Sequence, residues 1–280
     1  MILSAVQIGT KLYAPEENRA WIEAAVRREA AEGAALVVLP ELAVSGYGSD
    51  PDRLAESAEP RDGPTLDLLA RLSAELKLVL VCGYCESADG ALYNSAVLTA
   101  PGRAPAHYRK LHLFDREKEV FRPGDLGLVM AETDIGTIGI CVCYDLRFVE
   151  VARGLALGGA DLLAVPTAWV GGFDAVARDD GGYIGQARGA VVQANLNQLP
   201  MVCASQSGGD QGIRFLGSSL IADAFGTCVA GPMGEDETGV IRAEMTLEAI
   251  RAARIRSDRI RPREDRRTDT YGVSVNGRLH

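Results

Sequence analysis

The stretch IGICVCYDLRF, residues Ile138–Phe148, decides which fold can be expected for this chain of 280 residues. Its first half is a short apolar, β-branched run typical of a buried strand, and its second half leads into the helical pattern of Val151–Leu157. Cys143 therefore lies at a predicted strand-to-helix corner, near the rim of a sheet. A helix dipole there would favour a thiolate and a nucleophilic role. The alternative is a cysteine that packs as a small buried hydrophobe, which is the commoner case in an apolar strand.

Helices and strands alternate on both sides of this corner. Predicted helices are 15–31, 64–76, one after Cys143, about 183–197 and 247 to about 256, and predicted strands are 35–39, 78–82, 91–98, 106–110, 161–165, 201–205, 218–222, 227–230 and 239–244. Without a repeat or a flexible linker, one domain over 1–280 is expected, with an Arg- and Asp-rich tail at about 257–280. Helix–strand units mixed with hairpins predict an α/β fold of mixed sheets covered by helices.

Composition narrows the possible partners. The net charge of −9 argues against nucleic acid or an anionic membrane, because both attract clustered Lys and Arg. No apolar run reaches the roughly 18 residues of a membrane helix, and residues 1–8 are typical of a strand and not of a signal peptide. The six cysteines lie in apolar runs, and the Cys82–Cys85 pair lacks a second pair at zinc spacing. We therefore expect a cytoplasmic protein that binds neither nucleic acid nor membranes, and no metal site at the Cys82–Cys85 pair.

A catalytic cysteine needs a base and a group that stabilises an oxyanion. The chain has only three histidines: His280 is the last residue, and His107 and His112 lie in an alternating stretch, so a Cys–His pair is poorly supported. Glu41 is the better candidate, because it follows an apolar strand and Pro40, where burial would raise its pKa towards the range useful for proton transfer. The alternative is a glutamate that caps the next turn.

Lys110 is the candidate for the oxyanion. Only four of the 29 basic residues are lysines, so a lysine in the strand-like segment 108–113 is not simply the default cation of this chain. A compact ammonium also suits a single oxyanion better than a planar guanidinium does. The alternative is an ordinary surface cation.

Three segments together resemble the signatures of the carbon–nitrogen hydrolase (nitrilase) superfamily. They occur in the family's order and at compatible separations, and the resemblance covers about residues 1–245. Phe121–Asp125 is similar to the family's usual link between the second and third segments. The segments are Leu39–Leu42 with Ser45–Tyr47, Tyr108–Phe114, and Gly139–Phe148. One Glu, Lys or Cys alone would mean little, but three embedded motifs rarely coincide.

The resemblance implies a site, a fold and an assembly. It implies Glu41 as base, Lys110 as oxyanion stabiliser and Cys143 as nucleophile. A second glutamate orients substrate in this family, and Glu117 fits that role best, with Glu119 as second choice. The implied fold is a four-layer α-β-β-α sandwich with two mixed sheets, usually paired into a homodimer or higher homo-oligomer.

The implied reaction is hydrolysis of a small carboxamide to a carboxylic acid and ammonia. Glu41 would take the thiol proton, Cys143 would attack the carbonyl carbon, and Lys110 with the backbone N–H of Tyr144 would meet the oxyanion. Glu41 would then protonate the departing ammonia and activate the water that hydrolyses the thioester. No metal or organic cofactor is required.

The chain also departs from the family's pattern. Val149 stands where the family often has Pro, and Gln193–Asn197 lacks the Arg and Glu of a run common in the later helix, so subunit contacts there cannot be carried over. Typical nitrilases have Trp-Glu after the cysteine, whereas Tyr144-Asp145 is more usual in amidases and carbamoyl-cleaving relatives. An N-carbamoyl amidohydrolase and a nitrilase remain alternatives, and the intact motifs disfavour a non-enzymatic binding role.

Tyr47, after the base, and Trp169, after a later strand, are expected to wall the substrate pocket together with Tyr144. Their large, mostly apolar side chains suit an acyl group with few charges. Arg178 or Arg188 could still reach in to hold a substrate carboxylate. Core or dimer packing is the alternative for Trp169. We therefore expect a small, mostly neutral carboxamide as substrate.

Overall fold

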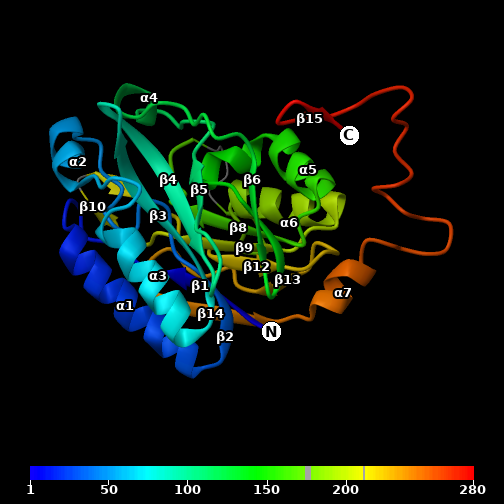
Figure 1. Ribbon diagram of the computed structural model, residues 1–280, viewed down its shortest axis with the longest axis horizontal. Helices are drawn as coiled ribbons and strands as arrows, with labels where there is room; N and C mark the ends of the chain where they lie inside the picture. Colours follow the sequence, from blue (N-terminus) through cyan, green and yellow to red (C-terminus); the bar gives the residue numbers. More distant parts are fainter. Residues whose placement is uncertain (174–177, 211) are drawn as a thin grey trace.

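A computed structural model describes residues 1–173, 178–210 and 212–280. Two six-stranded sheets lie face to face, and helices cover their outer faces (Figure 1). The four-layer α-β-β-α sandwich implied by the motifs is thereby confirmed.

The first sheet is built mainly from the N-terminal part of the chain. Its elements and flanking helices are β1 Ile2–Gln7, α1 Pro15–Ala31, β2 Ala34–Val38, α2 Pro51–Ser57, α3 Pro64–Leu76, β3 Val79–Ala88, β4 Ala91–Thr99, β5 Ala106–Arg109 and, late in the chain, β14 Gly239–Glu244. The strand order is β14-β1-β2-β3-β4-β5. The pairs β1–β2 and β2–β3 are parallel, whereas β14, β4 and β5 pair antiparallel, so the sheet is mixed.

The second sheet follows in sequence. Its elements and neighbours are α4 Glu117–Val120, β6 Val129–Thr133, β7 Gly136–Ile140, the 3-10 helix η1 Cys143–Arg147, α5 Val149–Gly158, β8 Leu162–Thr167, α6 Gly185–Asn197, β9 Met201–Ser205, β12 Leu220–Ala222, β13 Cys228–Ala230 and α7 Leu247–Ala252. Two short hairpins pair β10 Gly209–Asp210 with β11 Ile213–Arg214, and β15 Ser274–Val275 with β16 Arg278–Leu279. The strand order β13-β12-β9-β8-β7-β6 is again mixed, with β7, β8 and β9 parallel.

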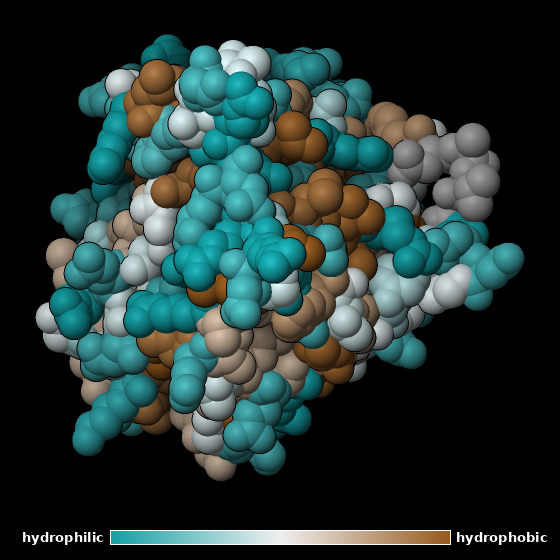
Figure 2. All heavy atoms as spheres, turned by 90° about the vertical axis from the view of Figure 1, so that its right-hand side faces the viewer, coloured by the Kyte–Doolittle hydropathy of each residue, from teal (hydrophilic) through white to brown (hydrophobic). Residues whose placement is uncertain are grey.

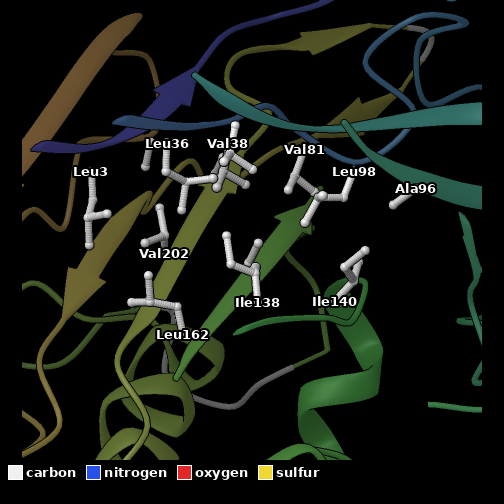
Figure 3. Close-up of a cluster of buried hydrophobic side chains, with 14 of the residues drawn as sticks. Leu3, Leu36, Val38, Val81, Ala96, Leu98, Ile138, Ile140, Leu162 and Val202 are labelled. Atoms are coloured by element: carbon white, nitrogen blue, oxygen red, sulfur yellow. The ribbon is translucent and has the colours of Figure 1, made fainter. Parts of the chain in front are cut away.

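The main core lies between the two sheets. Strand β2 shows how alternation builds it: Leu36 and Val38 pack in this core, while Val37 and Leu39 pack under α1 and α3. The run at 35–39 is thus buried on both faces, as predicted. Figure 3 shows side chains of the two sheets facing each other across the core, among them Leu36, Val38 and Val81 opposite Ile138, Leu162 and Val202. On the other side of the second sheet, α5 and α6 cover a further apolar cluster.

Several sequence-based expectations need correction. Cys143 opens the five-residue 3-10 helix η1, and the α-helix begins only at Val149, so the expected α-helical dipole at Cys143 is wrong. Lys110 follows β5 instead of lying inside a longer strand. The later helix begins at Gly185, the last ends at Ala252, and the sequence patterns missed β6, α2 and α4.

The C-terminal tail lies against the second half of the sandwich. Asn276 exchanges two hydrogen bonds of 2.9 Å with the backbone of Leu128, and the Arg263 guanidinium donates to carbonyls at the ends of α5 and α6. Figure 2 looks onto the side that carries α7 and the tail, where apolar side chains are interspersed among hydrophilic ones. None of the helices in the described ranges combines the length and apolar character needed to cross a bilayer.

Candidate active site

Glu41 lies in the turn that follows β2 and is held from both sheets. Its backbone N–H donates to Thr167 O of the second sheet at 3.2 Å, and its carbonyl accepts from the Gln206 side chain at 2.9 Å. On the other side, the Gly83 N–H donates to Pro40 O at 3.1 Å. A Cβ on Gly83 would lie only 2.6 to 2.7 Å from backbone atoms of the Pro40–Leu42 segment. Only glycine therefore permits this close approach of β3 to the Glu41 turn.

Lys110 and Glu117 meet Glu41 in one buried cluster. The Lys110 ammonium lies 2.6 Å from Glu41 Oε1 and 2.8 Å from Glu117 Oε1, and all three side chains are nearly or fully buried. Asn94 Nδ2 donates to Glu41 Oε1 at 2.7 Å, and the Tyr47 hydroxyl donates to Glu117 Oε1 at 2.6 Å. Glu41 Oε2 is buried and has no hydrogen-bond partner among the described residues. It is the oxygen that remains able to accept a proton.

Burial and charge set the protonation states of this cluster. Burial raises the pKa of Glu41 to about 7, although the Lys110 ammonium opposes that rise. Burial alone would lower the pKa of Lys110, but the carboxylates of Glu117 and Glu41 outweigh it, so the pKa rises and the ammonium stays charged. A carboxylate that titrates near neutral pH beside a permanent cation is suited to proton transfer.

Cys143 sits at the sharp corner between β7 and η1. Its φ of +48° is in the left-handed region, which is strained for a residue with a side chain. Burial raises the pKa of the thiol well above its usual value, the Glu41 charge raises it further, and the Lys110 ammonium and the Ala168 N–H oppose the rise. The thiol therefore needs a base to become a nucleophile. The first hydrogen bond of the η1 turn is donated by the Asp145 N–H to Val142 O. The Tyr144 N–H comes one residue earlier, so this turn does not use it as a donor.

Asp145 connects the Cys143 corner to the Lys110 segment. Its fully buried carboxylate accepts from the Tyr108 hydroxyl at 2.7 Å and from the Val142 N–H at 2.9 Å through Oδ2. Through Oδ1 it accepts from the His112 N–H at 3.0 Å and contacts His112 Nδ1 at 2.8 Å. Sequence reasoning assigned no role to Asp145 or Asn94. A polar residue inside the apolar run of β4 was the one signal that could have pointed to Asn94.

Two adjoining cavities open beside this cluster. The smaller, about 70 Å³, is lined by Cys143, Tyr144, Trp169 and Gly189 among others. The larger, about 520 Å³, is lined by Tyr47 and Glu117 among others. Both share Phe114, Val170 and Phe173, and the rings of Phe114 and Phe173 meet edge to face with centroids 4.8 Å apart. An acyl group bound next to the thiol would therefore meet mostly apolar and aromatic walls.

The structure places the remaining predicted residues as follows. Trp169 lines the smaller cavity and also packs in the apolar cluster under α6, so its contribution to the core is observed and its contact with substrate stays a prediction. Glu119 is exposed and pairs loosely with Arg116, at 3.7 Å, away from the Lys110 cluster. The two arginines suggested for a substrate carboxylate are engaged elsewhere: Arg178 donates to Leu216 O at 2.6 Å, and Arg188 pairs with Asp179. Neither is among the described residues that line the two cavities.

Comparison with known proteins identifies the family. Residues 2–255 match the family model described as carbon-nitrogen hydrolase. The chain belongs to the carbon–nitrogen hydrolase family. As a member of the nitrilase superfamily, it is 34% identical over 269 residues to a Pyrococcus abyssi protein named nitrilase, with 95% of this chain and 97% of that relative covered.

Other carbon–nitrogen hydrolases have different named activities. The N-carbamoylputrescine amidase of Solanum lycopersicum is 33% identical over 274 residues, which cover 91% of this chain and 89% of that enzyme. The crystal structure of an amidase from Nesterenkonia sp. superposes with a TM-score of 0.78 at 23% identity, covering 96% of this chain and 94% of that one, which shows the shared fold. The family is therefore settled by sequence, whereas the relatives' names differ in substrate.

Proposed function

We propose that this carbon–nitrogen hydrolase cleaves small, mostly neutral carboxamides to a carboxylic acid and ammonia through a thioester on Cys143. The observation that carries the proposal is the buried Lys110 ammonium, which contacts both Glu41 and Glu117. In agreement with it, burial raises the pKa of the Cys143 thiol and the Lys110 ammonium opposes that rise. In this proposal Glu41 is the base, Lys110 stabilises the oxyanion, and Glu117 orients the substrate.

The proposed reaction proceeds in two halves. Glu41 Oε2 takes the proton of the Cys143 thiol as the sulfur attacks the carbonyl carbon, and the oxyanion is stabilised by Lys110 and the Tyr144 N–H. When the C–N bond breaks, Glu41 returns its proton to the nitrogen and ammonia leaves. Glu41 then takes a proton from water, the hydroxide attacks the thioester, and the proton returns to the departing thiolate.

The walls of the smaller cavity favour a short acyl group. Trp169, Leu146 and Val170 offer apolar contact, and the Phe114–Phe173 pair contributes to the walls of both cavities. Steric limits of this kind discriminate acyl chains by about 1–3 kcal/mol for each methylene group.

The second candidate is an N-carbamoyl amidohydrolase. Asp115 lines the larger cavity and supplies a carboxylate that could pair with the ammonium of a carbamoylated diamine, the kind of substrate named for the tomato relative. A nitrilase is the third candidate and would use the same residues on a nitrile. The Tyr144-Asp145 pair after Cys143 makes it the least favoured of the three.

A substrate panel and mass spectrometry of the intact protein test the proposal. Amides, N-carbamoyl amines and nitriles are assayed for ammonia, and the chain is incubated with an activated acyl donor. We expect ammonia from small amides and one acyl adduct on Cys143. Cys143→Ala should abolish both, and Cys141→Ala, the matched control two residues earlier, should retain both. Turnover above about a hundredth of the wild-type rate in Cys143→Ala would refute the nucleophile assignment, because a lost nucleophile ordinarily costs several orders of magnitude.

We also propose that the enzyme is a cytoplasmic homodimer. Val192 and Leu196 on α6 and Phe225 nearby are about half exposed, and burial of such side chains in a subunit interface would stabilise the dimer. Light scattering coupled to size-exclusion chromatography measures the mass directly. A monomer at micromolar concentration would contradict the assembly.

A further inference from the structure

The segments that carry Lys110 and Cys143 come from different sheets. Lys110 directly follows β5 of the first sheet, and Cys143 follows β7 of the second. Their relative position is therefore not fixed by a shared strand ladder. Contacts between the two segments must fix it.

Asp145 makes such contacts on both sides of Lys110. Tyr108 and His112 stand two residues before and two residues after Lys110, and both donate to the Asp145 carboxylate. The same carboxylate accepts from the Val142 N–H, next to Cys143 in the chain. The His112 ring also stacks on Phe148 at the end of η1, with centroids 3.6 Å apart and planes 14° apart.

A carboxylate is required at this place by the pattern of donors. Each Asp145 oxygen accepts from one backbone N–H, Val142 on Oδ2 and His112 on Oδ1. Backbone N–H groups cannot turn round, so an amide side chain would direct its own NH₂ at one of them. Charge-assisted bonds inside a buried network are also stronger than neutral ones.

We propose that Asp145 is a positioning residue that sets the separation and orientation of the Cys143 thiol relative to the Lys110 ammonium. It acts through Tyr108, His112 and the Val142 N–H without touching substrate. The proposal rests on the roles proposed above for Lys110 and Cys143.

The test compares Asp145→Asn with Asp161→Asn in the full chain. Asp161 is a matched control, because it is also a buried carboxylate that accepts a backbone N–H, from Thr137 at 2.9 Å, but its other partners are Arg251 and Arg254. For each variant we would measure the melting temperature, kcat and KM on one small amide, and the rate at which iodoacetamide alkylates Cys143.

Both variants should melt at a lower temperature, but only Asp145→Asn should lose turnover. Misplacement by about 1 Å can cost roughly 10²-fold, so we expect kcat to fall about a hundredfold with KM changed less than about threefold. Alkylation of Cys143 should slow as well. A folded Asp145→Asn with kcat and alkylation within about threefold of wild type would overturn the proposal, as would an equal loss of kcat in Asp161→Asn.

One further variant, together with the alkylation rate, keeps the test decisive. If Asp145→Asn does not fold, Tyr108→Phe removes one donor and keeps the ring, and about a tenfold fall in kcat is expected; an unchanged kcat in folded Tyr108→Phe would overturn the proposal. The alkylation rate does not depend on turnover. If the wild type hydrolyses none of the amides, the proposed function fails, and the alkylation rates alone still support or overturn the role of Asp145.

Discussion

Replacement of Gly83 by alanine should impair the Glu41 turn without touching any ionisable group. The added Cβ would lie 2.6 Å from Leu42 N, 2.6 Å from Pro40 O and 2.7 Å from Glu41 Cα, all backbone atoms. Ordinary contact requires about 3.4 Å, so the turn must move by about 0.8 Å. Because a shift of about 1 Å can cost roughly a hundredfold in rate, we expect kcat to fall by about 10- to 100-fold.

The stability cost of Gly83→Ala should be moderate. Overpacking costs about 1–3 kcal/mol, offset by about 0.5–1 kcal/mol because alanine restricts the unfolded chain more than glycine does. One kcal/mol corresponds to roughly 2–4 °C in a chain of this size, so the melting temperature should fall by at most about 10 °C.

Steady-state kinetics and thermal unfolding of Gly83→Ala test this reasoning, with Gly154→Ala as control. A Cβ at Gly154 would be equally close to its neighbours, 2.6 Å from Leu128 Cδ1, but those neighbours are side chains that can move, and Gly154 lies on α5 away from Glu41. The control should keep kcat within about twofold, because flexible side chains absorb the added methyl group at little cost. A folded Gly83→Ala with normal kcat would refute the claim that this contact positions Glu41.

Four other substitutions test the site. Asn94→Ala removes a hydrogen bond that lowers the Glu41 pKa, so that pKa should rise above its value of about 7. Because Glu41 must be deprotonated to act as base, the acidic limb of the pH profile of kcat/KM should move to higher pH. An unchanged or lower midpoint would contradict the assignment of Glu41 as base. Lys110→Arg places a larger, planar group in a fully buried site, and kcat should fall about as far as in Lys110→Ala; near-normal turnover would make the residue a generic cation. Gly189→Ala adds a methyl group to the lining of the smaller cavity, where it meets no atom of the described residues within 4 Å apart from its chain neighbours and its own helix backbone. The kcat/KM ratio of butyramide to acetamide should therefore fall about tenfold while the helix becomes slightly more stable, and a constant ratio would remove Gly189 from the acyl pocket. Trp169→Ala should broaden acceptance of bulkier amides and raise KM for small ones, and identical kinetics on every amide would exclude Trp169 from substrate binding.

The sequence predicted most of the framework because its local signals agree with the final contacts. Helices α1 and α3 begin at Pro15 and Pro64, a preferred first helical residue, and their predicted bounds match the structure. Strand β6 was missed, because an edge strand with intermediate burial along most of its length lacks the alternation that marks a strand. The 3-10 turn at Cys143 was missed, because a positive φ for a cysteine has no sequence signature.

The site was predicted where motifs exist and missed where it depends on distant contacts. Glu41, Lys110 and Cys143 were singled out by their sequence context and their motifs, and Glu117 by the family resemblance. The structure brings Lys110 into hydrogen-bonding contact with Glu41 and Glu117, although the catalytic roles stay proposals. Asn94 meets Glu41 across 53 positions of sequence, and Tyr108 meets Asp145 across 37. The first pairing depends on the strand order of the first sheet and the second on how the two sheets stack, and no local pattern encodes either.

The division of the candidate site between two sheets also has a consequence for the chain before it has folded completely. Strand β14, which pairs with β1 at the edge of the first sheet, is synthesised only after every strand of the second sheet. Until the sheets dock, the Cys143 thiol is separated from the carboxylate that would activate it. On the roles proposed above, formation of a thioester with Glu41 as base therefore requires a chain in which the two sheets have docked.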